Sequence, residues 1–314
     1  MSWVNTQFYG SEVDIFYHVK ELQYQAKPER PDPLFAKKLQ EVLGGQFGEI
    51  SVAMQYLFQG WNIRGNGKYK DLLLDTGTEE LAHIEMLATM IARLLDNAPV
   101  ADQEEAAKNP VIAAVLGGMN PQHAIVTGLG AAPTDSVGYP WNGRYIIASG
   151  NLLADFRANL NAESQGRLQV ARLYEQTSDR GVRDMLSWLL ARDTMHQNQW
   201  MAAIAELEEK EGKVVPSTFP RKLEKREVSY TLFNFSRGDD SALGRWASGP
   251  SPDGCGRFNY VANPVPLAPA PHLPPAPPYI YDTPPGVVSG KGPFVPPCAI
   301  KGAARPAAPC RPRP

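Results

Sequence analysis

Cysteine is scarce in this chain of 314 residues, and neither sign of charge is in excess. The three cysteines, Cys255, Cys298 and Cys310, all stand late in the sequence, in an odd number and without zinc-site spacing. They therefore predict no disulfide framework. The 31 basic and 33 acidic residues leave a formal net charge of -2. We therefore expect no extended basic surface, and neither nucleic acid nor a membrane as a partner.

Long apolar runs are also missing. A stretch such as "VIAAVL" at 111–116 is far shorter than the ~20 residues that a membrane-spanning helix needs. The N-terminus has no basic region leading into an apolar segment, which is what a secretory signal would show. We therefore expect a cytoplasmic protein, and 43% apolar residues are ordinary for a globular core.

Four long segments carry apolar residues at helical spacing. The gaps inside the first pair and inside the second pair are short, so each pair should form an antiparallel hairpin. Residues 98–150, rich in proline and glycine, separate the two pairs. The pattern predicts an all-α, ferritin-like four-helix bundle with one long crossover. The predicted helices span about 32–59, 68–97, 151–176 and 179–210.

The regions outside the helices differ in composition. Between 264 and the end, 17 of the 29 prolines fall in 51 residues. Such a segment is an extended or disordered arm, either a solvated tail or an arm wrapped over a neighbouring subunit. The predicted division is an N-terminal extension (1–31), the bundle (32–212), an irregular segment (213–263) and the proline-rich arm (264–314).

Polar residues interrupt the apolar face of every predicted helix. A lone glutamate precedes a carboxylate-x-x-His pair by 31 residues in the first hairpin and by 30 in the second. In a bundle, this repeated plan brings the ligands of a dinuclear metal site to one level of the core. The residues are Glu49, Glu80, His83, Glu163, Asp193 and His196.

The cost of burying carboxylates supports a metal site. An unpaired ionised carboxylate in an apolar interior costs several kcal/mol or takes up a proton. Two divalent cations would balance four such groups, and carboxylate oxygen with imidazole nitrogen suits manganese or iron. One Glu-x-x-His pair alone is usually an exposed pair or a core histidine; the repetition in both hairpins favours metal.

Several longer motifs make the chain resemble a known family. They are "KELQYQAKPERPDP", "LQEVLGGQFGE", "YKDLLLDTGTEELAHIEMLATMIA", "ASGNLLADFRANLNAE", "RLQVARLYEQTSDRGVRDMLSWLLARDTMHQ" and "NFSRGDD". Over about residues 20–245, in order and spacing, the sequence resembles the manganese catalases. The resemblance implies disproportionation of hydrogen peroxide into water and dioxygen, two manganese ions per chain and a hexamer.

The resemblance also implies roles for the site residues. Glu80 would bridge the two manganese ions, Glu49 and His83 would complete one, and Glu163 and His196 the other. Asp193 would be an outer-sphere acid and base, at a position where a glutamate is common in the family. A second departure from some members is Ala162, which stands where they carry an arginine that covers the site.

A calcium site at a subunit boundary is implied as well. Its oxygen ligands would suit a hard cation, although Asp71 and Asp75 are equally compatible with being solvated surface acids. The residues that match are Asp71, Asp75, Asn234, Ser236 and Gly238.

Two further interpretations belong to other classes of protein. One is a ferritin-like protein that binds iron or works as an oxidase at a di-iron site, although Asp193 is a poor substitute for its second glutamate. The other is a structural, coat-type protein that retains the metal site, with the proline-rich arm as its attachment.

Overall fold

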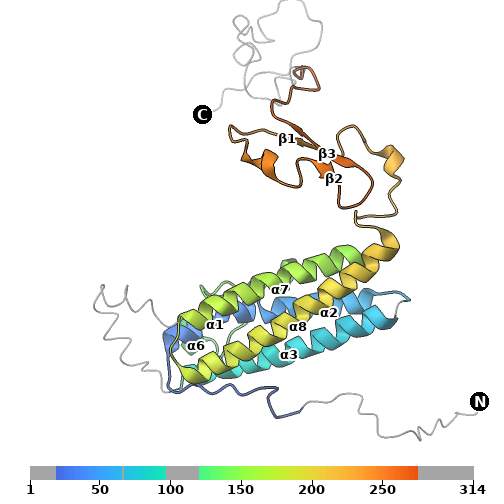
Figure 1. Ribbon diagram of the computed structural model, residues 1–314. Helices are drawn as coiled ribbons and strands as arrows, with labels where there is room; N and C mark the ends of the chain where they lie inside the picture. Colours follow the sequence, from blue (N-terminus) through green and yellow to red (C-terminus); the bar gives the residue numbers. More distant parts are fainter. Residues whose placement is uncertain (1–18, 66, 97–119, 275–314) are drawn as a thin grey trace, which may run out of the picture. The chain divides into compact units, whose positions relative to one another are not determined.

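The computed structural model describes residues 19–65, 67–96 and 120–274. Its long helices form a bundle in which α2 packs along α3 and α7 packs along α8 (Figure 1). The predicted ferritin-like bundle of two hairpins is thereby confirmed. The bundle helices are α1 (Pro33–Gly44), α2 (Glu49–Asn62), α3 (Gly67–Leu94), α7 (Leu152–Glu175) and α8 (Arg180–Glu211).

The first predicted helix, 32–59, is wrong as a single element, because the chain leaves helical geometry between Gly44 and Glu49. Gly45 is extended, with φ -70° and ψ 175°. A Cβ atom on Gly44 would clash with the backbone of Thr134, so the crossover passes close to the end of α1. The break makes Glu49 the first residue of α2, where the helix dipole favours a negative charge.

The ends of α7 and α8 are fixed by capping groups. The Asn151 side chain accepts a hydrogen bond from the Ala154 amide at 3.0 Å. Asp179 Oδ1 accepts one from the Val182 amide at 2.9 Å, and α8 ends at Gly212, whose φ is +83°. Helix α8 therefore confirms the helix predicted at about 179–210, with a capping aspartate before it and a glycine after it.

The described part of the crossover is held on α1 by one buried amide. Gln40 Nε2 donates to the carbonyl oxygens of Ala132 at 2.6 Å and Thr134 at 2.9 Å. Gln40 Oε1 accepts from the Ala132 amide and lies 3.0 Å from His123 Nε2. Residues 97–119 of the predicted crossover lie outside the described residues. The described crossover includes helix α6 (Pro121–Ile125) and the 3-10 turn η1 (Gly143–Tyr145).

The described residues divide into two compact units: those up to 230 together with 250–257, and 231–249 together with 258–274. Short strands occur in the segment predicted to be irregular. They form a sheet of order β1-β3-β2, with β1 parallel to β3 and Thr231 opposite Asn259. The elements are η2 (Arg221–Leu223), β1 (Thr231–Phe233), η3 (Asp240–Leu243), β2 (Gly249–Pro250) and β3 (Arg257–Val261).

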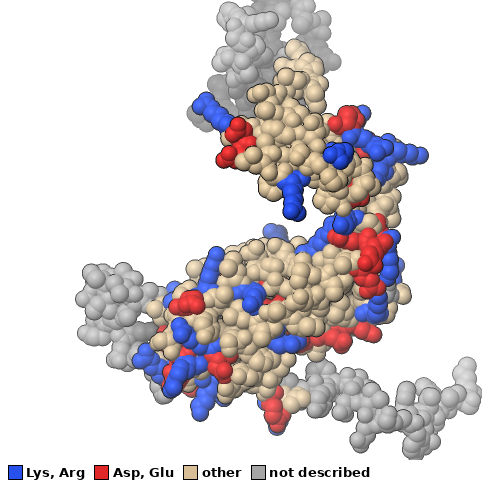
Figure 2. Space-filling model, in the orientation of Figure 1, with Lys and Arg blue, Asp and Glu red and all other residues tan. Residues whose placement is uncertain are grey.

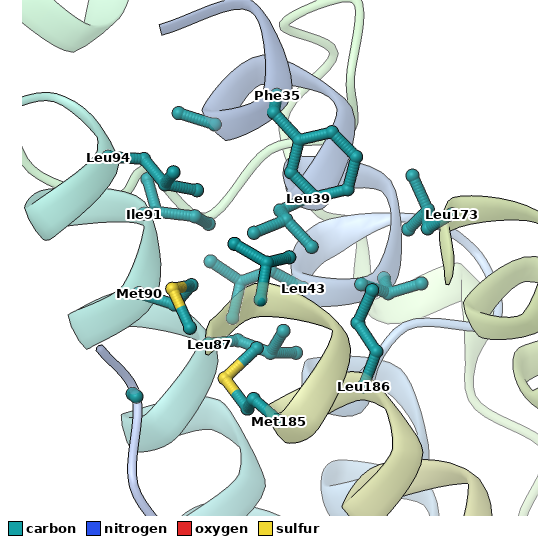
Figure 3. Packing of buried hydrophobic residues seen from close by; sticks show 14 of the residues in the cluster. Phe35, Leu39, Leu43, Leu87, Met90, Ile91, Leu94, Leu173, Met185 and Leu186 are labelled. Carbon is teal, nitrogen blue, oxygen red and sulfur yellow. The ribbon is translucent and has the colours of Figure 1, made fainter. Parts of the chain in front are cut away.

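The core of the bundle consists of two apolar clusters. One is built around Leu39, Leu87 and Met185, and Figure 3 shows its closely packed aliphatic side chains. The other contains Leu73 and Trp200. The predicted site residues belong to neither cluster, although they lie on the same helices between the members of the two. A polar layer therefore separates two apolar regions.

The surface of the bundle carries both signs of charge. Lysine and arginine are interspersed with aspartate and glutamate on the visible face (Figure 2). Within the described ranges, no helix combines the length and the apolar composition that crossing a membrane requires.

The Asp179 cap yields a prediction about stability. Its Oδ2 also accepts from the Glu29 amide at 2.8 Å, which ties the N-terminal segment to the start of α8. Asp179→Ala should lower the free energy of unfolding by about 1–2 kcal/mol, measured by urea unfolding. Glu209→Ala, at an exposed position of α8, is the control. Equal urea midpoints for the two variants would contradict this role.

Candidate metal centre

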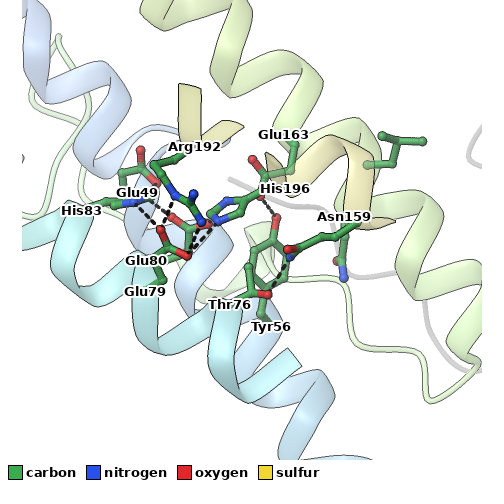
Figure 4. Close-up of polar contacts among 12 residues, drawn as sticks. Glu49, Tyr56, Thr76, Glu79, Glu80, His83, Asn159, Glu163, Arg192 and His196 are labelled. Atoms are coloured by element: carbon green, nitrogen blue, oxygen red, sulfur yellow. Dashed lines mark hydrogen bonds and ion pairs between the residues drawn. The ribbon is translucent and has the colours of Figure 1, made fainter. Parts of the chain in front are cut away.

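The six site residues come from four helices and are buried inside the bundle, and Figure 4 shows the side chains of Glu49, Glu80, His83, Glu163 and His196 close to one another. Glu49 begins α2, Glu80 and His83 lie in α3, and Glu163 lies in α7. All six are buried, with exposed fractions between 0% and 8%. The exposed fractions are 8% for Glu49, 1% for Glu80, 0% for His83, 5% for Glu163, 6% for Asp193 and 1% for His196.

Glu80 is at the centre of the arrangement. Its Oε2 lies 2.6 Å from Nδ1 of His83, and its Oε1 lies 2.8 Å from Nδ1 of His196. Despite these short distances, none of the four atoms makes a hydrogen bond. Buried polar atoms are rarely left in this condition. Atoms that converge without bonding one another are suited to a shared positive partner.

The side chains form two groups that could each hold a metal ion. One contains Glu49, Glu80 and His83, the other Glu80, Glu163 and His196, and in each group one ligand atom per residue lies within 4.8 Å of the others. Glu80 belongs to both groups, and Asp193 to neither. Carboxylate oxygen with neutral imidazole nitrogen suits manganese or iron, so the residues fit a pair of such ions.

Burial and mutual repulsion shape the acidity of these groups. Burial, and then the charge of Glu80, raise the pKa of Glu49 to about 8. Burial also raises the pKa of Glu80, but the charge of His83 and the close approach of both imidazoles outweigh it and hold that pKa well below its usual range. For His196, burial lowers the pKa, whereas the nearby carboxylates of Glu163, Glu79 and Glu80 outweigh burial and raise it to about 12.

Asp193 is placed differently from the five other residues. It lines a cavity of about 10 Å³ together with Glu49, Glu163 and Ala162, which is near the minimum that holds one water molecule. Its Oδ2 is buried and has no hydrogen-bond partner. Burial, followed by the charges of the neighbouring glutamates, raises the pKa of Asp193 well above its ordinary value.

Tyr56 is a site residue that the sequence pattern did not single out. It lies on the apolar face of α2, fully buried, with its ring centroid 5.0 Å from that of Trp200. Its hydroxyl donates a hydrogen bond to Glu163. Because tyrosine fits an apolar stripe, its spacing gave no signal of this polar role.

Glu79 and Arg192 were also missed. Arg192 donates to Glu79 through Nε at 2.6 Å and through a terminal nitrogen at 3.1 Å. His196 Nε2 lies 3.2 Å from the same carboxylate. A usable signal existed, since a metal-binding imidazole commonly donates its second N–H to a carboxylate, and Glu79 stands four residues before His83.

The residues of the implied calcium site lie in two units. Asp71 and Asp75 are exposed on α3, in the bundle unit. Asn234, Ser236 and Gly238 belong to the other unit, where Asn234 Oδ1 accepts from the Ser236 amide at 3.0 Å. The calcium site therefore stays a prediction.

Known proteins resemble this chain over most of its length. The family model for manganese containing catalase matches residues 15–291. An uncharacterised protein of Bacillus subtilis, YjqC, is 71% identical over 86% of this chain and 98% of its own. A manganese catalase of the same organism is 68% identical over 87% of this chain and 99% of its own.

A solved structure agrees with the sequence comparison. The manganese catalase KatB from Anabaena superposes with a TM-score of 0.62 at 32% identity, covering 80% of this chain and all of its own. The chain belongs to the manganese-containing catalase family, whose members are enzymes that break down hydrogen peroxide. This finding favours the catalase over the di-iron and coat-type interpretations.

The raised pKa values predict how pH affects the metal-free protein. Between pH 4.5 and about 8 the folded chain keeps a proton on Glu49 that the unfolded chain has released, and above pH 6.5 His196 behaves likewise. The free energy of unfolding of chelator-treated protein should therefore fall from pH 5.5 to pH 8, as urea unfolding would measure.

The manganese-loaded protein is the control for this pH dependence. Metal binding needs deprotonated ligands, so added metal should stabilise the protein more at pH 8 than at pH 5.5. A metal-free protein that becomes more stable towards pH 8 would show that the buried groups do not hold these protons.

Proposed function

We propose that this chain disproportionates hydrogen peroxide at a centre of two manganese ions per chain. Glu49 and His83 would hold one ion, Glu163 and His196 the other, and Glu80 would bridge them. When bound, the pair of ions would supply two electrons reversibly, one from each ion, and a positive site for peroxide. The single observation that carries the assignment is that each Glu80 oxygen faces the Nδ1 atom of a different histidine, at 2.6 and 2.8 Å.

Asp193 is the proposed proton carrier of this reaction. Its carboxyl group lines the small cavity beside Glu49 and Glu163 but belongs to neither metal-holding group. Burial and the neighbouring glutamate charges raise the pKa of Asp193, which favours its protonated form, and its unpartnered Oδ2 is available to a small molecule. General acid and base catalysis needs a group of this kind within reach of the substrate.

The assembly and location of the protein are proposals from the family resemblance. They comprise a hexamer, a cytoplasmic location and a calcium ion bound by Asp71 and Asp75 with Asn234, Ser236 and Gly238. The exposure of both aspartates on one face of α3 supports an exchangeable cation.

Metal analysis and an oxygen-evolution assay on the same purified protein test the proposed function. Purified protein should contain close to two manganese ions per chain and release dioxygen from added hydrogen peroxide in an oxygen electrode. A chain loaded with iron that consumes dioxygen, or a metal-loaded chain without turnover, would overturn the proposal.

Asp193→Asn separates a proton carrier from a metal ligand. The amide fills the same volume but cannot accept and return a proton. We expect manganese content to stay near wild type while turnover falls roughly 10²- to 10⁴-fold. Asp193→Glu, which restores the carboxyl group, is the matched control and should retain far more activity. Manganese lost in parallel with rate would make Asp193 a ligand, and full activity of Asp193→Asn would remove both roles.

The double variant Asp71→Asn, Asp75→Asn tests the calcium site. It should lose bound calcium and weaken subunit assembly, because neutral amides are poorer ligands for a hard cation. Calcium content and sedimentation measure the two effects, and Glu209→Gln on exposed α8 is the control. Unchanged calcium content would show that these aspartates are ordinary surface acids.

A further inference from the structure

Both proposed histidine ligands turn their second nitrogen towards one carboxylate. Nε2 of His196 lies 3.2 Å from Oε2 of Glu79, and Nε2 of His83 lies 3.6 Å from Oε1 of the same residue. The two imidazole rings are nearly parallel, with centroids 5.8 Å apart and 22° between planes. Figure 4 shows Glu79 beside this pair of rings, with Arg192 of α8 extending to it.

The surroundings of Glu79 consist of hydrogen-bond donors. Arg192 forms a two-point contact, with Nε 2.6 Å from Oε1 and a terminal nitrogen 3.1 Å from Oε2. Gln23, in the N-terminal segment, donates through Nε2 to Oε1 at 3.1 Å. A planar guanidinium holding both oxygens of a carboxylate fixes its plane as well as its position.

We infer that Glu79 is a positioning residue that fixes both histidine ligands at once, and that Arg192 anchors it. An imidazole that donates from Nε2 leaves the lone pair of Nδ1 free, which is the tautomer that a metal ligand needs. Here the free Nδ1 atoms are those that face Glu80. The contact with His196 Nε2 at 3.2 Å sets the tautomer and ring orientation of that ligand, and the charge of the same carboxylate, 3.6 Å from His83 Nε2, favours a proton on the corresponding nitrogen of His83. This inference rests on the proposed ligand assignment.

The donor-only surroundings explain why an amide would not serve in place of Glu79. A glutamine has one oxygen and one NH₂ group, so one side of its amide would face N–H groups with an N–H of its own. Either the side towards His196 or the side towards His83 and Gln23 would lose its acceptor. Because Arg192 contacts both oxygens, no rotation of the amide satisfies both sides.

Glu79→Gln tests the inference through metal affinity. The manganese dissociation constants, measured by chelator competition, should rise roughly 10- to 100-fold. The electron paramagnetic resonance spectrum of the manganese-loaded variant should also change, because a reoriented imidazole alters the ligand field. Arg192→Lys keeps the charge but offers one nitrogen, so its affinity should lie between those of wild type and Glu79→Gln.

Glu206→Gln is the matched control, since it removes a carboxylate paired with Lys68 and Lys210 elsewhere on α8. It should leave manganese affinity and spectrum unchanged. Wild-type affinity and spectrum in Glu79→Gln would overturn the inference. If Glu79→Gln does not fold, Arg192→Lys serves as the test. Wild-type manganese affinity and spectrum in that variant would overturn the inference.

The variants His83→Ala and His196→Ala test the ligand assignment on which this inference rests, separately from the role of Glu79. If both variants keep two manganese ions, the ligand assignment itself is wrong. If they lose manganese while Glu79→Gln binds it as wild type does, only the role of Glu79 is wrong.

Discussion

The concentration of carboxylates in the interior is the constraint on which the rest of the structure depends. Glu49, Glu80, Glu163 and Asp193 are all buried, and the groups facing them are two imidazoles and a tyrosine hydroxyl. Ionised carboxylates without a positive partner cost several kcal/mol in such surroundings. Because burial penalises the ionised form, the pKa values of Glu49, Glu163 and Asp193 are raised. Bound cations would relieve it.

Apolar packing on both sides stabilises the helices that carry this polar layer. The helices extend far enough to build one apolar cluster around Leu87 and another around Trp200, with the carboxylates between them. Most helix stability in proteins comes from tertiary packing. Packing at both ends therefore holds the helices together while the middle carries groups that repel one another. The hairpin topology brings both halves of the site to one level.

Helical spacing predicted which faces of the helices carry the site, but it says little about contacts between helices. Glu80 and His83 share one face of α3, so their convergence followed from the sequence. Glu79 lies about 100° further round the helix, where a glutamate usually faces water, and its partner Arg192 is 113 residues away. Thr134 approaches Gly44 closely at the end of α1, beside the break before Glu49, and local periodicity gives no sign of this contact between distant parts of the chain.

The two sides of the proposed metal centre differ in their surroundings, one being hydrogen-bonded and the other lined by a small cavity. On one side, Arg192 and Nε2 of His196 form charge-assisted hydrogen bonds with Glu79, an arrangement suited to holding a ligand in a fixed position. On the other, Asp193 and the short side chain of Ala162 line a cavity with room for about one water molecule. An arginine at position 162 would extend towards that space. With alanine there, no side chain extends beyond Cβ into that space, and the small size of the cavity would limit which molecules could reach Asp193.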